Sequence, residues 1–297
     1  MKNYLILCID LDEWYHGRWA TGSSISRWTS VQDCLQDYYK SNKPAGEIVE
    51  PTYRILDSLK KEGVKATFFI LGEVAEWYPD LVSEIAQEGH EIACHGMYHR
   101  DPNLYSRQKF SQELVQAKLI LERLAGRPVI GYRAPNLIIT KWLHEVLIEQ
   151  RFLYDSSMCP GREIQGKYKG QSSAPNNPYR IDKSSLCLKG DANLIEIPIP
   201  VFPLLKLPGA VSIATRIFGW IWTSITLYNA LRTGAACYYM HPYEFNEAPK
   251  LQNMSLRQRV FFRRTGAFME NILQRLLNKY RGRIVSAEYY VLKCFNE

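Results

Sequence analysis

The stretch ILCIDLDEWYH, residues 6–16, runs from a short apolar segment directly into Asp10, Asp12 and Glu13. The apolar segment shows no polar alternation, which is typical of a strand that is buried on both faces in a parallel sheet. Acidic side chains at the end of such a strand repel one another and lose hydration. They are tolerated where cations neutralise them, so this stretch predicts both a central strand and one edge of a functional site.

The composition is that of a chain able to bury a sizeable core. The 297 residues, of which 46% are hydrophobic, suffice for one large α/β domain or two small ones. The formal net charge of +7 is modest for this length and suits an anionic partner such as a phosphate-bearing lipid, a nucleotide sugar or a membrane surface. Nucleic acid is not expected, because no RNP, zinc-finger or helix-turn-helix signature occurs.

Two features bear on the cellular compartment. The seven cysteines have no regular spacing, which predicts reduced thiols and a cytoplasmic protein. The apolar run at the start of the sequence is too short for a signal peptide and lacks a small-residue cleavage site, so no export is expected. The long apolar segment 207–232 contains Arg216 and recurrent Thr, Ser and Asn, which favours a core helix over a helix on or across a membrane.

Short apolar runs alternate with helical patterns along almost the whole chain, which predicts a parallel sheet covered by helices. Seven or eight such units suggest a closed (β/α) barrel, and a doubly wound open sheet is the alternative. We expect strands at 4–9, 65–71, 90–94, 128–133, 152–157, 193–199, 235–241 and 283–287. We expect helices at 52–63, 79–89, 106–126, 140–150, 207–232 and about 255–280. No phosphate-binding glycine motif follows the first strand.

We interpret residues 1–297 as a single domain. The irregular segment 17–48 is predicted to form a long loop or lid over one face. Residues 246–297 form a basic helical part, whose arginines and lysines either meet a phosphate-bearing lipid or lie on a solvated helix face.

Chemically competent side chains collect at the predicted carboxyl ends of the strands, where parallel (β/α) folds place their sites. The residues at these ends are Asp10, Asp12, His95, His99, Arg133, Asn136, Asp155 and His241. The pair His95 and His99 has the i, i+4 spacing that brings two imidazoles to one side of a helical turn. With one carboxylate, such a pair forms a common catalytic zinc set that leaves a coordination position open.

The chemistry of these groups suggests distinct roles. Asp12 completes the metal set with His95 and His99, and zinc is expected, although such sites also accept iron or cobalt. Asp10 is the candidate base, since position 96 is Gly and the motif is therefore not H-E-x-x-H. Arg133 pairs with an acid and orients it, and His241 is placed to protonate a leaving amine.

Each motif taken alone has a plainer explanation. A D-x-D pair often caps a turn, and an H-x-x-x-H pair is common by chance. His90 and His144 are assigned to structure, while Glu13 and His16 receive no role. Trp14 and Tyr15 offer a stacking face for a sugar ring. The conjunction of such residues at five strand ends is what favours a catalytic site.

The motifs DLD (10–12), HGMYH (95–99), GYRAPN (131–136), YDSS (154–157) and YYMHP (238–242) occur in the order of the five motifs of the NodB-type polysaccharide deacetylases, carbohydrate esterase family four. The chain resembles that family from residue 1 to about 245. Its later part is similar to a subgroup often found with exopolysaccharide and surface-glycan biosynthesis. The resemblance implies a distorted (β/α) barrel and a divalent metal, most simply zinc.

The resemblance also implies roles for individual residues. Asp10 matches the catalytic base and Asp12 the metal-binding acid, while His95 and His99 match the metal histidines. Arg133 matches the arginine that orients the base.

In the remaining motifs, Asp155 matches an acid that supports this arginine, and His241 matches the catalytic acid. The backbone N–H near Asn136 matches part of the oxyanion hole. The sequence departs from many members at Leu11, which separates the two aspartates, and at Asn136, where an aromatic residue is usual.

These observations predict a cytoplasmic, metal-dependent amidohydrolase that removes an acetyl group from an amino sugar of a surface glycan or its lipid-linked precursor. A cyclic amide or imide hydrolase of the allantoinase kind keeps the same site with another substrate. A third alternative is a non-catalytic glycan-binding barrel. Glycan binding alone needs neither the candidate base Asp10 nor the candidate acid His241, so their presence argues against it. Peripheral contact with a membrane or lipid-linked glycan is a further possible partner interaction.

Overall fold

The first strand, β1 (Leu5–Leu11), is the centre of the structure, a computed structural model that describes residues 3–164 and 166–295. All of its residues are buried, as the unbroken apolar run predicts. Strand β9 (Ala236–Met240) pairs with one edge of β1 over five registered positions, from Leu5 with Ala236 to Ile9 with Met240. Strands β2 (Thr67–Ile70) and β10 (Ile284–Val285) also pair with β1.

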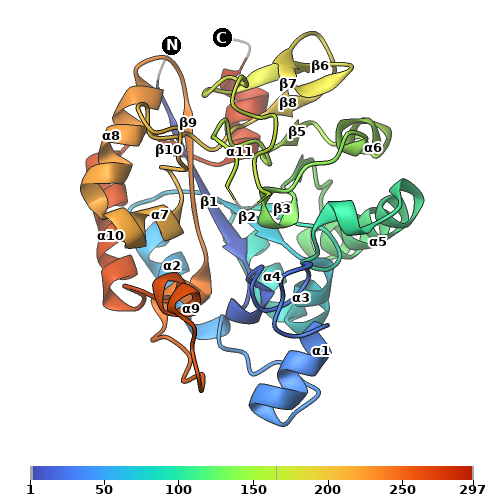
Figure 1. Ribbon diagram of the computed structural model, residues 1–297. Helices are drawn as coiled ribbons and strands as arrows, with labels where there is room; N and C mark the ends of the chain where they lie inside the picture. Colours follow the sequence, from blue (N-terminus) through green and yellow to red (C-terminus); the bar gives the residue numbers. More distant parts are fainter. Residues whose placement is uncertain (1–2, 165, 296–297) are drawn as a thin grey trace.

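From β2 the parallel sheet continues through four short strands. They are β3 (Glu91–Cys94), β4 (Gly131–Tyr132), β5 (Tyr154–Asp155) and β8 (Ile195–Glu196). The hairpin of β6 (Tyr179–Asp182) and β7 (Ser185–Lys189) adds antiparallel strands beside β8. Since β8 pairs with β6 and not with β9 in the described residues, the sheet curls without closing (Figure 1). The predicted (β/α) barrel is therefore a curled, open half-barrel.

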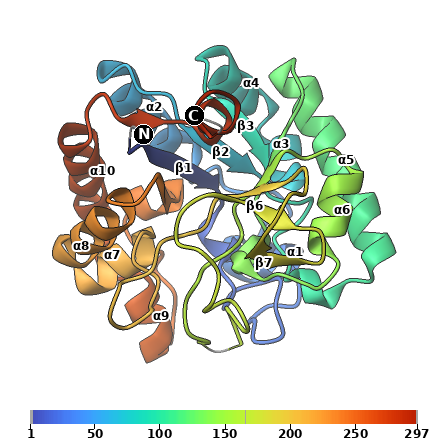
Figure 2. The same ribbon diagram turned by 90° about the horizontal axis from the view of Figure 1, so that it is seen from above.

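Helices surround the sheet when it is viewed from above (Figure 2). They are α1 (Val31–Cys34), α2 (Val49–Lys61), α3 (Gly72–Trp77), α4 (Pro79–Gln87), α5 (Arg107–Ala125), α6 (Leu143–Glu149), α7 (Ser212–Phe218), α8 (Trp220–Leu231), α9 (Leu256–Phe261), α10 (Ala267–Lys279) and α11 (Ala287–Tyr289). Helix α5 is capped at both ends: Ser106 accepts a hydrogen bond from the Lys109 N–H, and Gly126 adopts a left-handed conformation.

Two predicted helices are each divided in two. The segment 207–232 breaks at Gly219, where φ is +87°, into α7 and α8. The segment 255–280 breaks at Gly266, where φ is +69°, into α9 and α10. Glycine adopts positive φ without a Cβ clash, so each break lets the chain turn back over the sheet. None of the helices in residues 3–164 and 166–295 has the length and hydrophobicity that a bilayer span requires.

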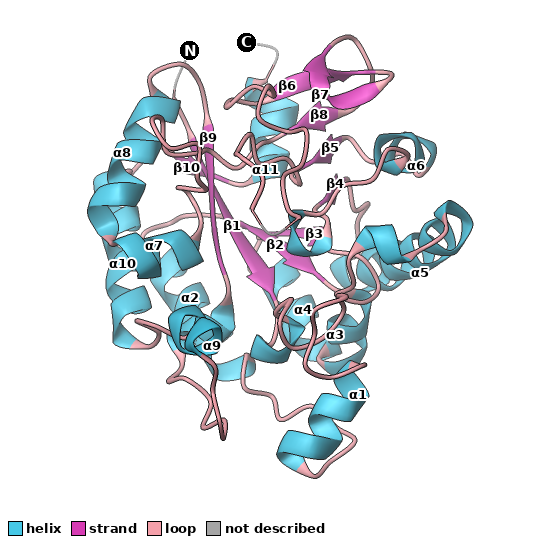
Figure 3. Cartoon of the chain, viewed as in Figure 1, coloured by secondary structure: helices cyan, strands magenta, loops and turns pink. Residues whose placement is uncertain are grey.

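Other differences concern short elements. Helix α3 and the β6–β7 hairpin were not among the predicted elements. Much of the segment 17–48 is loop, with α1 and an adjoining turn of π-helix as its regular part (Figure 3). Its first residues, Gly17 to Trp19, line the cavity described below, so this end of the predicted lid does lie over the site.

Candidate active site

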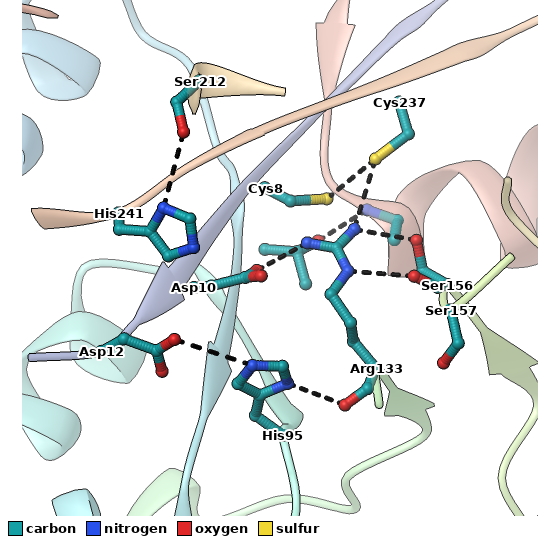
Figure 4. Close-up of polar contacts among 12 residues, drawn as sticks. Cys8, Asp10, Asp12, His95, Arg133, Ser156, Ser157, Ser212, Cys237 and His241 are labelled. Atoms are coloured by element: carbon teal, nitrogen blue, oxygen red, sulfur yellow. Dashed lines mark hydrogen bonds and ion pairs between the residues drawn. The ribbon is translucent and has the colours of Figure 1, made fainter. Parts of the chain in front are cut away.

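The carboxyl ends of the central strands open into one cavity of about 410 Å³. Asp10 and Asp12 reach it from β1, His95 and His99 from the loop after β3, and His241 from the end of β9. Parallel strands bring their carboxyl ends to the same edge, so residues far apart in sequence converge here. Figure 4 shows Asp10, Asp12, His95 and His241 around a common centre.

Asp12, His95 and His99 lie together as a triad of side chains that could hold a metal ion. One ligand atom of each lies within 4.8 Å of the others. The Asp12 Oδ2 atom is 3.3 Å from His99 Nε2 and 3.9 Å from His95 Nε2. The Nδ1 atom of His95 lies 2.7 Å from the Arg133 carbonyl, to which it donates, so the lone pair on Nε2 points toward Asp12.

The surroundings of the triad fit a divalent cation. All three side chains are buried, yet Asp12 Oδ1 and His99 Nδ1 have no hydrogen-bond partner in the described part of the chain. Burial raises the pKa of Asp12, but the charges of His99 and His95 outweigh it and hold that pKa far below its ordinary value. Burial lowers the pKa of His95, which favours the neutral, ligating form. Two imidazoles and a carboxylate are the donor set that zinc prefers in catalytic sites.

Arg133 clamps the candidate base. Its Nη1 donates to Asp10 Oδ1 at 2.5 Å, and both side chains are buried. The remaining guanidinium donors reach the carbonyl of Ser156 at 3.0 Å, the Ser156 hydroxyl at 2.8 Å and the Cys237 sulfur at 3.3 Å. Burial lowers the pKa of Arg133, but Asp10 outweighs this, so the guanidinium stays charged. Arg133 therefore holds one oxygen of Asp10 and fixes the orientation of its carboxyl group.

A second buried charge network holds His241. Glu244 Oε2 lies 3.3 Å from His241 Nδ1, and Glu244 Oε1 accepts hydrogen bonds from Ser212 Oγ at 2.8 Å and Arg216 Nε at 3.0 Å. Burial raises the pKa of Glu244, but Arg216 and then His241 lower it to about 2. Burial likewise lowers the pKa of His241, but Glu244 outweighs it and raises that pKa. Glu244 thus favours the protonated form of His241, the imidazole that lines the cavity.

Two family models match the chain. Residues 44–151 match the model described as polysaccharide deacetylase, and residues 156–286 match one described as a domain of unknown function (DUF3473). Residues 44–151 therefore belong to a polysaccharide deacetylase domain of the NodB type. Over 106 residues the chain is 40% identical to a peptidoglycan-N-acetylglucosamine deacetylase of Bacillus cereus. The aligned segment covers 34% of this chain and 38% of that protein. The chain spans between 38% and 44% of the length of the first curated relatives that it matches.

Solved structures share the fold over nearly the whole chain. A Mycobacterium smegmatis protein assigned to the polysaccharide deacetylases superposes with a TM-score of 0.60 at 19% identity, over 98% of this chain and 90% of the other. Puue allantoinase superposes with a TM-score of 0.56 at 15% identity, over 97% of this chain and 90% of the other. The deacetylase domain therefore has a fold that also serves an allantoinase, and the fold by itself does not separate the two activities.

Asp155 lies behind the site and not in it. Ser157 donates to Asp155 Oδ1 at 2.5 Å and accepts from the Ala134 N–H at 2.8 Å. Among the described contacts, Arg133 makes no hydrogen bond to Asp155, so the predicted support is indirect, through Ser157 and the backbone beside Arg133. Burial raises the pKa of Asp155 to about 6, and buried Glu196 is its registered partner on the neighbouring strand.

Trp14 and Tyr15 do not form the predicted stacking face. Both are buried and neither lines the cavity of the deacetylase domain. Trp14 packs against Trp19 and donates from its Nε1 to the Tyr39 hydroxyl at 2.8 Å. The prediction is corrected because the chain turns inward directly after Asp12, which places these aromatic rings in the core. Trp19 is the aromatic residue of this segment that lines the cavity.

The residues without a predicted role are structural. Glu13 accepts a hydrogen bond from the Tyr78 hydroxyl at 2.9 Å, and burial raises its pKa to about 8. His16 accepts from the Glu13 N–H at 3.0 Å and stacks on His99, with ring centroids 5.9 Å apart. Burial lowers the pKa of His16 to about 3, so it is neutral and supports the orientation of His99.

Asn136 lies at the cavity with its side chain turned away from the centre. Its Nδ2 donates to Asp101 Oδ1 at 2.8 Å, and its φ of +58° is left-handed. Within residues 3–164 and 166–295, the Asn136 N–H has no protein acceptor. This N–H, and not the amide side chain, is the group available to a substrate.

Sequence reasoning missed several residues. Glu244 and Arg216, which hold His241, and Ser156 and Ser157, which hold Arg133 and its backbone, received no individual role. The spacing of Glu244 three residues after His241 is the signal that could have revealed it. The apolar wall of the cavity also was not foreseen; it comprises Leu207, Pro208, Ile213, Ala214, Ile217, Phe218, Val260 and Phe261.

Proposed function

We propose that the protein is a metal-dependent N-deacetylase that hydrolyses the acetamide of an N-acetylated amino sugar, in a surface polysaccharide or its lipid-linked precursor. One observation carries the proposal. A carboxylate clamped by Arg133 and an imidazole clamped by Glu244 face the same cavity as the Asp12, His95 and His99 triad. Amide hydrolysis needs a base, an acid and an electrophile arranged in this way.

The roles follow from the geometry. A divalent cation, most simply Zn²⁺, held by the triad supplies Lewis acidity toward the amide carbonyl. Asp10 accepts the proton of the attacking water, because Arg133 holds one of its oxygens and orients the carboxyl group toward the cavity. The Asn136 N–H donates to the oxyanion of the tetrahedral intermediate. His241 then transfers its proton to the amine as the C–N bond breaks, since Glu244 favours its protonated form.

The experiment measures acetate release from N-acetylglucosamine oligomers by the zinc-loaded protein. Asp10→Asn is expected to reduce the rate by about 10²- to 10⁴-fold while leaving zinc content unchanged. Asp80→Asn, at an exposed position on α4, is the matched control and keeps the wild-type rate. Release of product only from a cyclic amide such as allantoin contradicts the proposal, and so does binding of the oligomers without any turnover.

The biological setting is also part of this proposal. We assign the protein to the cytoplasm because its seven cysteines have no regular spacing, which suits reduced thiols. The similarity of its C-terminal part to the exopolysaccharide subgroup supports a role in surface-glycan biosynthesis. Fractionation of cells that express the tagged protein, followed by analysis of amino-sugar acetylation in the surface glycan of a deletion strain, tests both assignments.

A further inference from the structure

Helix α8 has an apolar face that the fold leaves uncovered. Its inner side is buried through Thr223, Thr226, Leu227, Ala230 and Leu231. Its outer side presents Ile221, Ile225 and Tyr228, which are 74%, 40% and 63% exposed. Their i, i+4 and i+7 spacing aligns them in one stripe. A helix that is apolar all round is normally buried, so an exposed stripe of this kind needs a partner.

The neighbouring elements extend this face. Phe218, at the end of α7, is 50% exposed and stacks on Trp222 with ring centroids 4.5 Å apart. Trp222 stacks in turn on Phe202 at 3.8 Å, which fixes the tight turn 202–207 beside α8. The tip of that turn carries Leu204 and Leu205, 87% and 47% exposed. We call Leu204, Leu205, Phe218, Ile221, Ile225 and Tyr228 the apolar face.

Uncompensated positive charge surrounds the apolar face. No Asp or Glu occurs between Glu196 and Glu244 in the sequence. The exposed basic residues on and beside these elements are Lys206, Arg232, Arg263, Arg264 and Lys279. Lys279 donates to Ser224 of α8, and Arg264 donates to the Arg216 carbonyl at 3.4 Å, so both belong to this side of the molecule. Within the described residues, none of the five forms an ion pair with an acid.

The apolar face is continuous with the catalytic cavity. Phe218 belongs to both, since it is half exposed and also lines the cavity. Val260, 39% exposed, is a second such residue on α9. Behind them, Leu207 and Ile217 carry the apolar wall toward His241. Helices α7 and α8 lie at the periphery of the molecule in both Figure 1 and Figure 2, where a flat partner has access.

We propose that the apolar face docks on the surface of an anionic phospholipid bilayer. The aliphatic and aromatic side chains enter the interfacial region, while the surrounding basic side chains meet lipid phosphates. The unpaired cations favour this occupant over a second copy of the chain, which would bring the same positive charge to the interface. Docking places the mouth of the cavity at the membrane, which suits a lipid-linked saccharide; this last step rests on the proposed function.

The test is co-sedimentation of the purified full chain with vesicles of phosphatidylcholine, with or without phosphatidylglycerol. We expect binding to the anionic vesicles that weakens with added salt. The variant Ile221→Ser, Ile225→Ser, Tyr228→Ser should reduce the partition coefficient tenfold or more. The control Leu104→Ser, Leu119→Ser, Leu188→Ser removes equally exposed apolar side chains elsewhere and should bind as the wild type does.

The contribution of the basic side chains to vesicle binding is tested separately. Lys206→Gln combined with Arg232→Gln should lower binding to anionic vesicles about 30-fold, at about fivefold for each basic side chain. Failure of the wild type to bind either kind of vesicle overturns the proposal. So does a wild-type dimer that the α8 variant converts to a monomer, because a second copy would then cover the face. Acetate release from soluble oligosaccharides should be the same in all these variants, so failure of docking is distinguishable from failure of the proposed activity.

Discussion

Replacement of Glu244 by Gln tests whether the second charge network controls the acid His241. Glu244 has a pKa of about 2 and is ionised throughout the working range. At its 3.3 Å separation from His241 Nδ1, Coulomb's law with an effective dielectric constant of about 20 sets a ceiling of about 5 kcal/mol on the stabilisation of the imidazolium. Gln keeps the shape and part of the dipole, so we expect kcat to fall about 10- to 100-fold.

The pH dependence of kcat shows in which direction Glu244 shifts the pKa of His241. A general acid must be protonated, so activity is lost as the pH rises through the pKa of His241. Glu244 raises that pKa, and its removal therefore moves the alkaline limb of the kcat profile to lower pH. The assay is the pH profile of kcat for acetate release, with KM recorded at each pH. An effect on KM alone, with the alkaline limb in its wild-type place, would refute the assignment.

A control for folding is required, since Glu244→Gln leaves the charge of buried Arg216 without its partner, which costs about 3–5 kcal/mol. The double variant Arg216→Met, Glu244→Gln removes both charges and should therefore regain the stability lost in Glu244→Gln. The alkaline limb of its kcat profile should stay at the lower pH, because Glu244 is still absent. Ser212→Ala removes a single neutral donor to Glu244 and should leave the limb nearly in place. Thermal unfolding of each variant separates loss of fold from loss of the acid.

Three further predictions concern the rest of the site. Arg133→Lys should lower kcat about 10²-fold with little change in KM, because an ammonium cannot make the forked contacts of the guanidinium to Asp10 and its neighbours. Steady-state kinetics measure this effect. An unchanged kcat would contradict the role of Arg133 in orienting Asp10. The variant His95→Ala, His99→Ala should lose near-stoichiometric zinc in elemental analysis, and retention of zinc would place the metal elsewhere. Glu13 has a pKa raised from 4.5 to about 8, so stability falls as the pH rises through this range; Glu13→Gln should remove about 5 kcal/mol of that fall in denaturant unfolding.

The arrangement of the catalytic residues was largely predictable because the signals are local. A strand of unbroken apolar residues that ends in Asp10 and Asp12 places both acids at a sheet edge. The spacing of His95 and His99 is a property of one turn. In the structure all four side chains line the same cavity, together with His241.

Contacts between distant segments were not predictable in the same way. The distortion of the barrel depends on β8 pairing with the β6–β7 hairpin, which no periodicity in a single strand reveals. The burial of Trp14 and Tyr15 depends on a turn after Asp12 and on partners such as Tyr39 that arrive from another segment. From the sequence alone, an aromatic residue beside an acidic site residue is equally consistent with a buried core side chain and with one that stacks on a sugar ring.

The sequence by itself indicated most of the strand and helix order and placed Asp12, His95 and His99, with the candidate base Asp10 and the candidate acid His241, at strand ends, since these are matters of residue type and short-range spacing. Only the tertiary structure decided that Glu244 and Arg216 hold His241 and that helix α8 turns an apolar face outward. The physical reason is that charge pairing and burial depend on distances in space, and those distances exist only once the sheet has brought β1, β9 and their flanking helices together.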